Sequence, residues 1–453
     1  MQNGISILDF LQFDCPTQEQ KAALLAMAEF VKPENKDDFF ILCGAAGTGK
    51  TSITTALIGY MNNREIDYKI AAPTNRAARI MAKKSKVLSN TIHSMIYTIE
   101  NNAETGEVRY KLKTREMQEP HSCVFIIDEA SMVNAKIAKQ EESLFSAEDS
   151  LLNDLVKFIK QYHQDSKVVI LGDRNQLPPV KEKESYALMP EYLERNFSWK
   201  GNSHILTQVK RADDGTCIMK NAIRTREAIE RGQEAIALDA FKFKFGMGGA
   251  ATHYAKAVEE QGYEQNISIG CTHESNKYFN NLVRKKLFGS ECRLLEKGDY
   301  MLITQNWERN GVKLYNGDHV IVEDFNAEDV EMVTGLHFIP IKLKAKDTDG
   351  KYFFVEDYIL LDSIGEPGGV FSIEKEKLLR RDRYAKNKIY RETENIQDDR
   401  YLGAIRLTYG HSITCNKAQG GEWKNVYVNT FFIPNLKWQY TAITRAQQNL
   451  LLY

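Results

Sequence analysis

Long apolar runs, paired cysteines and an excess of charge of either sign are all missing from this chain. No apolar run approaches the ~20 residues of a membrane-spanning helix, and Asp9 interrupts the short apolar stretch near the start, so we expect neither a membrane anchor nor a signal peptide. The seven cysteines form no C-x-x-C pair, which argues against a disulfide framework or a zinc site. The net charge is −1, so a nucleic-acid groove would need local clusters of Lys and Arg.

Length and composition are those of an ordinary globular protein. The chain has 453 residues, enough for about three domains of usual size and for large cores. Hydrophobic residues make up 43% and charged residues 27%, which is typical of soluble proteins. We therefore expect a folded multidomain chain with reduced thiols in the cytoplasm, and no membrane among its partners.

One stretch matches a phosphate-binding pattern at every fixed position, because residues 44–51 read G-x-x-x-x-G-K-T. The apolar run 39–43 before it has strand composition, and residues 52–60 after it read as a helix. The glycines let the backbone wrap around phosphate oxygens, Lys50 would reach the β- and γ-phosphates, and Thr51 would ligate Mg²⁺. The stretch therefore predicts a nucleoside triphosphate site made of Gly44, Ala45, Ala46, Gly47, Thr48, Gly49, Lys50 and Thr51.

Two acids and an amide follow further apolar strands. The run 123–127 reads as a strand buried on both faces, which can place the carboxylates of Asp128 and Glu129 only at its carboxyl end. There Asp128 can hold Mg²⁺, and Glu129 can orient or deprotonate the attacking water. Gln176 follows the strand at 167–172 and could sense the γ-phosphate, with a proline-stiffened turn as the alternative. Four strand–loop–helix units predict a doubly wound parallel sheet of the RecA type.

Polar and basic side chains follow the short strand at 69–72. The turn and helix after it, and the stretch 91–94, suit contacts with the phosphates of a nucleic-acid backbone. A solvated basic helix face is the commoner explanation of such a run, and His93 alone is more often packed or capping than catalytic. The candidate contacts are Pro73, Thr74, Asn75, Arg76, Thr91 and His93.

Gln20 has two equally good interpretations. Thr17 with Gln20 three residues later has the spacing of a capping box at the start of a helix. Alternatively, the Gln20 amide makes paired hydrogen bonds to an adenine edge, because it precedes the phosphate loop by one helix and one strand. Spacing does not separate the two.

Two insertions interrupt the α/β pattern. Alternating segments around a turn-rich stretch predict a β-hairpin at about 95–121, which is either a wedge or decoration. Paired turns and alternating strands at about 296–403 predict a small antiparallel β-barrel and then a charged arm, whose alternating signs favour a solvated helix. We therefore predict an α/β fold with two cores, at 1–200 and 201–453. No second phosphate loop occurs, so we expect one nucleotide per chain, between the cores.

In this order the motifs resemble those of superfamily 1 helicases, specifically the 5′-to-3′ branch with the RecD-like and Dda-like enzymes. The resemblance covers nearly the whole chain and implies two RecA-like parallel-sheet cores. The inserted barrel looks like the Src-homology-like module of the family, and the hairpin falls where the family places its wedge. The matching stretches are Gln20, 44–51, 73–79 with 91–94, 128–129, 172–179, 408–420 and 440–445.

The resemblance also implies roles for individual residues. Gln20 matches the adenine-binding glutamine and Gly420 a nucleotide contact, while Arg211 and Arg445 match the two arginines that stabilise the transition state. The family usually has His where Asn416 stands, so the role of that His is in doubt, although Asn can still hydrogen-bond. The implied DNA contacts of the second core are Thr272, Asn276, Thr414, Asn416 and Lys417.

The function implied by the resemblance is an ATP-dependent DNA helicase that moves 5′ to 3′ on single-stranded DNA, with ATP and Mg²⁺ between the two cores. The partners expected are single-stranded DNA, single-strand/double-strand junctions, and single-strand-binding or replication proteins, and the expected state is a monomer. A DNA-binding ATPase switch that does not unwind is the alternative, which Glu129 and the two arginines disfavour. A small-molecule kinase would leave the second core unexplained.

Overall fold

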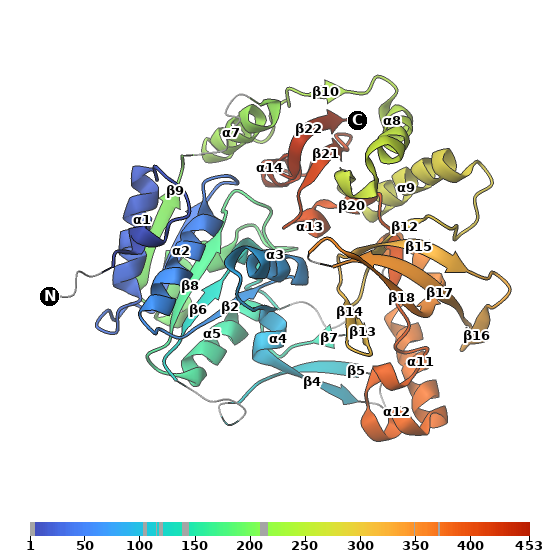
Figure 1. Ribbon diagram of the computed structural model, residues 1–453, viewed down its shortest axis with the longest axis horizontal. Coiled ribbons are helices and arrows are strands. Elements are labelled where there is room, and N and C mark those ends of the chain that lie inside the picture. Colours follow the sequence, from blue (N-terminus) through green and yellow to red (C-terminus); the bar gives the residue numbers. More distant parts are fainter. Residues whose placement is uncertain are drawn as a thin grey trace. The chain divides into compact units, whose positions relative to one another are not determined.

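Two compact units make up the protein, and each contains its own parallel sheet (Figure 1). The computed structural model describes residues 5–102, 107–114, 116, 121–137, 145–208, 216–347, 349–369 and 372–453. The first unit comprises 1–100, 109–142 and 146–216, and the second comprises the rest. In the described part of the chain, no helix is both long and apolar enough to cross a membrane.

The first sheet has six parallel strands in the order β3-β2-β6-β8-β1-β9. Its central strands are buried along their whole length, as their continuous apolar runs predict for a sheet covered on both faces. β9 lies beyond the boundary that we predicted at residue 200, yet it pairs with β1. The strands are β1 (Phe39–Gly44), β2 (Tyr68–Ala72), β3 (Ser89–Thr91), β6 (Val124–Ile127), β8 (Lys167–Gly172) and β9 (Gly201–Leu206).

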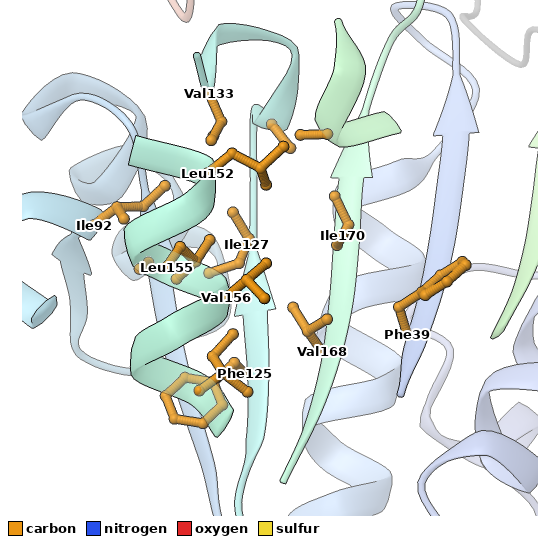
Figure 2. Packing of buried hydrophobic residues seen from close by; sticks show 14 of the residues in the cluster. Phe39, Ile92, Phe125, Ile127, Val133, Leu152, Leu155, Val156, Val168 and Ile170 are labelled. Atoms are coloured by element: carbon orange, nitrogen blue, oxygen red, sulfur yellow. The ribbon is translucent and has the colours of Figure 1, made fainter. Parts of the chain in front are cut away.

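Helices cover both faces of this sheet, and successive residues of β1 point to opposite cores. Phe39 and Ile41 belong to one core, while Phe40 and Leu42 belong to the other. Figure 2 shows the first core, where α5 packs Leu152, Leu155 and Val156 against Phe125, Ile127, Val168 and Ile170 of β6 and β8. The helices are α1 (Gln18–Phe30), α2 (Lys50–Asn63), α3 (Asn75–Ser85), α4 (Ile92–Ile96), α5 (Leu151–Tyr162) and α6 (Pro190–Phe197).

A separate small sheet contains the strands predicted for the hairpin insertion. Its order is β4 (Tyr97–Asn102), β5 (Glu107–Leu112) and β7 (Phe145–Ser146). Lys111 pairs with Glu100 at 2.7 Å, and its carbonyl accepts a hydrogen bond from the Thr98 hydroxyl at 3.2 Å. The turn at 103–106 lies outside the described residues, so its predicted role as a wedge stays a prediction.

The second parallel sheet has the order β10-β22-β21-β11-β20. Its strands are β10 (Phe241–Lys242), β11 (Asn266–Gly270), β20 (Ser412–Thr414), β21 (Trp423–Val428) and β22 (Ala446–Leu452). The helices around it are α7 (Cys217–Glu230), α8 (Gly246–Gln261), α9 (His273–Phe288), α13 (Cys415–Ala418) and α14 (Leu436–Ile443). The predicted α/β class with parallel sheets is therefore confirmed.

An antiparallel sheet is inserted in the second unit, in the region where alternating strands were predicted. It consists of β12 (Tyr300–Ile303), β15 (His319–Phe325), β16 (Glu331–Val333), β17 (Leu336–Lys346), β18 (Tyr352–Leu360) and β19 (Leu407–Tyr409), beside the pair β13 (Trp307–Arg309) and β14 (Val312–Leu314). A bridge between Ile359 and Ile405 also links β18 to the residues just before β19.

The charged arm is helical, and many of its charges pair with one another. Arg383 binds Asp399 at 2.8 Å, and Lys386 binds Asp382 at 2.7 Å. The helices are α10 (Asp362–Gly365), α11 (Ile373–Lys386) and α12 (Lys388–Thr393). These pairs favour the interpretation of the arm as a solvated helical segment rather than a binding stripe.

Candidate nucleotide and nucleic-acid sites

The three loops predicted to hold a nucleotide lie at one edge of the first sheet. The loop 44–50 follows β1, the turn with Gln176 follows β8, and Asp128 and Glu129 follow β6. β8 lies between β1 and β6, and all three strands are parallel, so their carboxyl ends are neighbours. The phosphate loop, the acids and the amide therefore meet within two strand spacings of about 5 Å each.

Glycine and lysine determine the shape of the phosphate loop. Gly49 has φ +88°, and a Cβ there would meet Nε2 of Gln20 at 2.7 Å, so only glycine fits this position. The Lys50 ammonium donates to the carbonyl oxygens of Gly44 at 2.5 Å and Ala45 at 3.1 Å. Thr51 follows in the first turn of α2, half-buried. The Lys50 ammonium thus binds the backbone of the loop that was predicted to hold phosphate.

Asp128 and Glu129 are held in an unfavourable arrangement. Burial raises the pKa of Asp128 above its ordinary value, and the charge of Glu129 raises it further, while Lys50 and Lys84 oppose the change. Glu129 has φ +49°, in the left-handed region that non-glycine residues rarely adopt. Such strain is typical of functional positions, and a cation near Asp128 would relieve the repulsion between the two acids.

The Gln176 side chain is buried, with 3% of its surface exposed. Its amide oxygen Oε1 has no hydrogen-bond partner among the described residues. The turn around it is fixed, because Arg174 donates from Nε and Nη2 to the Leu188 carbonyl at 2.9 and 2.6 Å. A buried acceptor without a partner costs about 1–3 kcal/mol, which a ligand or water that donates to it would offset.

Gln20 joins the start of α1 to the phosphate loop. The predicted capping box is confirmed, since the Thr17 N–H donates to Gln20 Oε1 at 2.9 Å and the Gln20 N–H to Thr17 Oγ1 at 3.1 Å. The amide Nε2 of Gln20 also donates to the Thr48 carbonyl at 2.9 Å. The adenine contact of Gln20 stays a prediction, for which one amide hydrogen and one oxygen lone pair are left.

The nucleic-acid contacts predicted in the first unit follow the two strands beyond β6. Residues 73–76 follow β2 and Thr91 ends β3, so they share the edge that carries the nucleotide loops. Both threonines act as helix caps, because Thr74 Oγ1 accepts from the Ala77 N–H and Thr91 Oγ1 from the Ser94 N–H. Their hydroxyls thereby fix the starts of α3 and α4 at this edge.

His93 packs among aromatic rings. Its ring centroid lies 5.7 Å from that of Tyr97 and 5.4 Å from that of Tyr110. Burial lowers its pKa, so the ring is neutral near pH 7. The structure therefore favours the packed histidine over a charged phosphate contact.

In the second unit, a pocket of about 20 Å³ gathers Asn276, Thr414 and Lys417. Asn276 Oδ1 accepts from the Ser412 hydroxyl at 2.8 Å, but Nδ2 has no partner in the described part of the chain. Burial lowers the pKa of Lys417 to about 8. An amide donor and a desolvated ammonium in one pocket suit an anion such as a backbone phosphate.

Other pocket residues were not anticipated from the sequence. His273 and Gly368 line the pocket, whereas the predicted Thr272 and Asn416 do not. Thr272 caps α9, accepting from the Ser275 N–H at 3.1 Å. Gly368 lies between β18 and β19 of the antiparallel sheet, about a hundred residues along the chain from His273, so no sequence pattern signals this contact.

Arg445 and Gly420 lie at the opposite edge of the second sheet. Arg445 precedes β22 and Gly420 precedes β21, so both are at the amino ends of these strands. The guanidinium is 4% exposed and donates to the carbonyls of Thr441 at 3.0 Å and Gly421 at 3.2 Å. The other predicted arginine, Arg211, lies outside the described residues.

Two family models match parts of this chain. A family model described as an AAA domain matches residues 28–182, and one described as a UvrD-like helicase C-terminal domain matches residues 409–453. The ATP-dependent DNA helicase Dda of Enterobacteria phage T4 is 22% identical over 362 residues, which cover 79% of this chain and 76% of Dda. The chain is thus similar to superfamily 1 helicases, the family that its motifs resemble.

Solved structures agree with this assignment at the level of the fold. A Bacteroides Pif1 helicase in complex with ADP-AlF3 and single-stranded DNA has a TM-score of 0.51 at 16% identity, over 97% of this chain and 92% of that chain. A Pif1 structure of forked-duplex unwinding by two helicases has a TM-score of 0.54, over 96% and 91% of the chains. The RecD2 helicase of Deinococcus radiodurans is 24% identical over 140 residues, 31% of this chain and 16% of RecD2.

Sequence reasoning missed a contact of Glu19 near the phosphate loop. Glu19, beside Gln20, accepts from the Thr207 N–H at 2.7 Å and the Gln208 N–H at 3.1 Å through Oε2, and from the Thr207 hydroxyl through Oε1 at 2.5 Å. Thr207 follows β9, whose last residue pairs with Gly44. The first turn of α1 thus holds both the phosphate loop and the chain that leaves the sheet, and only the fold reveals it.

The residues at this edge of the first sheet fit a nucleotide with Mg²⁺. Asp128 has a half-buried carboxyl whose pKa is raised by desolvation and by Glu129, and Thr51 offers a hydroxyl at the start of α2. No cluster of three or more His, Cys, Asp or Glu side chains able to hold a metal occurs among the described residues. Mg²⁺ commonly binds through one or two protein groups and the phosphates of a nucleotide.

Proposed function

We propose that this helicase hydrolyses ATP to move 5′ to 3′ along single-stranded DNA and to separate duplex DNA. The observation that carries the proposal is the meeting of the phosphate loop, Asp128 with Glu129, and Gln176 at three neighbouring strand ends. A loop that cradles phosphate beside a carboxylate that can activate water is what phosphoryl transfer to water requires.

Each residue of this edge has a part in the proposed hydrolysis. The phosphate loop and Lys50 hold the β- and γ-phosphates, and Gln20 contacts the adenine. Glu129 accepts a proton from the attacking water, and Gln176 orients that water through its unpartnered oxygen. Mg²⁺, when bound through Thr51 and Asp128, neutralises charge on the phosphates.

Two arginines complete the proposed site. Arg445 and Arg211 supply positive charge to the transferring phosphoryl group, and Gly420 approaches the nucleotide. Arg445 must first release the carbonyls of Thr441 and Gly421 that it binds. Hydrolysis is then tied to a rearrangement, because such an arginine changes the rate by about 10³–10⁵-fold in related chemistry.

Single-stranded DNA is proposed to contact the carboxyl edges of both sheets. The contacts in the first unit are Pro73, Thr74, Asn75, Arg76, Thr91 and His93, with His93 acting by stacking rather than charge. The contacts in the second are Thr272, Asn276, Thr414, Asn416 and Lys417.

The two insertions also have proposed roles. The strands β4 and β5 form the wedge, and the antiparallel sheet is a Src-homology-like barrel. The helicase acts as a monomer in the cytoplasm, at junctions, with single-strand-binding or replication proteins.

Strand displacement on tailed substrates tests the proposal. Duplexes with a 5′ tail, a 3′ tail or blunt ends are incubated with the helicase, ATP and Mg²⁺, and released strand is quantified. We expect release from the 5′-tailed duplex alone. Release from the 3′-tailed duplex would refute the polarity, and DNA-stimulated hydrolysis without release from any substrate would favour an ATPase switch.

A further inference from the structure

The carboxyl edge of the second sheet continues past the proposed DNA contacts. Thr272 follows β11 and Thr414 ends β20, the last two strands in the order β10-β22-β21-β11-β20. All these strands are parallel, so the loops after β21 and β10 lie at the same edge. Neither loop contains a residue that the proposed function uses.

Exposed aromatic side chains lie at both of these loops. After β21, Phe431 is 96% exposed and Phe432 is 57% exposed. At and after β10, Phe241 is 62% exposed and Phe245 is 88% exposed. A phenylalanine ring so exposed to water lacks the favourable free energy of burial. Neighbouring exposed aromatic side chains commonly mark a binding surface.

The two loops are fastened to the same strand, β22, which ends at the C-terminus between them (Figure 1). The Phe243 N–H donates to the Leu452 carbonyl at 2.9 Å, and the Thr430 N–H donates to the Tyr453 carbonyl at 2.7 Å. The ring of Phe243 also stacks on that of Tyr427 in β21, with centroids 6.2 Å apart. The loops are therefore anchored about two strand spacings, ~10 Å, apart.

The charge of these segments is positive, although the whole chain has a net charge of −1. Residues 240–258 and 423–453 contain no Asp or Glu. Lys242 and Lys244 alternate with the phenylalanines, and both are exposed. We define the edge surface as Phe241, Lys242, Lys244, Phe245, Phe431 and Phe432.

We propose that the edge surface is a second part of the single-stranded DNA site, in which Phe245 and Phe431 stack on bases and Lys242 and Lys244 contact phosphates. The inference rests on the proposed function for its substrate. Aromatic side chains interleaved with cations along an open edge are the usual platform for single strands, since every base has a face on which to stack. A protein partner is less well matched, because lysines are depleted from the cores of protein interfaces.

Binding of oligothymidylates of increasing length tests the inference on the full chain. Labelled strands of about 6 to 20 nucleotides are titrated by fluorescence anisotropy, a range that brackets known single-strand sites. The variants are Phe245→Ala with Phe431→Ala, and Lys242→Ala with Lys244→Ala. The matched controls are Phe354→Ala, 52% exposed on β18, and Lys285→Ala with Lys286→Ala near the end of α9.

The two variant pairs should fail in different ways. Removing the phenylalanines should weaken binding of long strands by about tenfold or more, leave short strands unchanged, and keep the salt dependence. Removing the lysines should lower the slope of log K against log salt by about 1.4, since each phosphate contact contributes ~0.7. The control variants should match the wild type in both respects, and melting temperatures should not change.

Several outcomes would overturn the inference. If affinity increases with strand length to the same extent in the wild type and in the phenylalanine variant, the edge surface is not part of the DNA site. The proposed function would then stand. Wild type that binds no strand of any length would refute the proposed function itself. Unchanged DNA binding with lost self-association in sedimentation, or with lost binding of a labelled peptide of alternating Glu and Phe, would assign the surface to a second copy or to an acidic protein.

Discussion

The two parallel sheets of this protein differ in where the proposed contacts lie. In the first, the nucleotide loops and the proposed DNA contacts share the carboxyl edge, on β1, β8 and β6 and on β2 and β3 respectively. In the second, the proposed DNA contacts lie at the carboxyl ends of β11 and β20, whereas Arg445 and Gly420 lie at the amino ends of β22 and β21. The proposed nucleotide and DNA contacts therefore share one edge of the first sheet but lie at opposite edges of the second.

The difference follows from what each unit must supply. Phosphate binding needs backbone N–H groups and a helix N-terminus, which a strand–loop–helix crossing such as 44–50 provides at a carboxyl edge. An arginine needs only a long side chain, so Arg445 can act from the other edge. On the proposed function, the second unit supplies only the cation of Arg445 to hydrolysis, so its whole carboxyl edge is left for the DNA strand.

Among changes that leave the binding of ATP and DNA intact, the largest effect is expected from the arginine of the second sheet. Arg445→Lys should lower kcat for ATP hydrolysis by about 10³–10⁵-fold, because lysine lacks the planar fork that stabilises the transition state. ATP and single-stranded DNA should bind as before. Steady-state hydrolysis with saturating DNA, together with nucleotide titration, measures both.

Arg406→Lys is the matched control, since Arg406 is also 4% exposed in the second unit and donates to a backbone carbonyl, that of Ala404. It should lower the melting temperature without lowering kcat. An equal loss of kcat in both variants would mean that Arg445 acts only through the fold.

A smaller loss is expected from the acid of the first sheet. Glu129→Gln should lower kcat by about 10²–10⁴-fold, the usual contribution of a general base, and should leave the affinity for ATP unchanged. Rapid-quench hydrolysis and equilibrium nucleotide binding separate these effects. Asp165→Asn, an exposed acid after α5, is the control, and a variant of Glu129 with wild-type turnover would place the base elsewhere.

The affinity for single-stranded DNA should fall at alkaline pH. Because the pKa of Lys417 is lowered to about 8, this lysine is neutral above that pH and must take up a proton to meet a phosphate. Kd should therefore rise by up to about tenfold per pH unit above 8, and Lys417→Met should abolish this dependence. His273 lines the same pocket, but burial and Lys417 lower its pKa, so it does not titrate in this range.

Lys417 should also leave a signature in stability. An unfolded lysine keeps its proton to a pKa of about 10.4, so the folded state is penalised below pH 8 and the penalty is lost as the pH rises. Because of this residue, the free energy of unfolding should increase as the pH rises from the folded to the unfolded pKa. Urea unfolding of the wild type and of Lys417→Met gives the difference, and parallel curves would show that the lysine is not desolvated.

The smallest effect is expected from Glu19. Glu19→Ala removes the acceptor of three hydrogen bonds to residues 207–208 and should cost about 1.5–3 kcal/mol of unfolding free energy. Glu29→Ala, an exposed acid later in the same helix, is the control and should cost less than about 1 kcal/mol. Equal losses would show that Glu19 does not anchor this segment.

Much of the first site was predictable because it is local in sequence. The loop 44–51 carries its own strand, glycines and helix start, and Asp128 with Glu129 directly follows a buried strand. The partners of Gln20 on Thr48 and of Glu19 on Thr207 were not predictable, because they join residues that are 28 and 188 positions apart. Propensity also cannot tell that the hydroxyls of Thr74 and Thr91 serve as caps.

The contacts of the second unit were harder to predict from the sequence. Its pocket joins α9 to the segment between β18 and β19 of the antiparallel sheet, so Gly368 and His273 meet only in the fold. The boundary at 200 fell short because β9 has few apolar residues and is half-exposed, and its pairing with β1 leaves no pattern in the sequence. The exposed phenylalanines 245 and 431 look like core residues until the fold leaves them in water.

Unwinding by a Lys50→Ala variant bears most directly on the proposal that a triphosphate held at the first sheet drives strand movement. The 5′-tailed duplex is mixed with wild type or variant, and DNA-stimulated hydrolysis and strand release are followed together, with Lys36→Ala as a control from an exposed loop. We expect both activities to vanish in Lys50→Ala, while binding of single-stranded DNA persists. Substantial strand release by the variant would contradict the proposal.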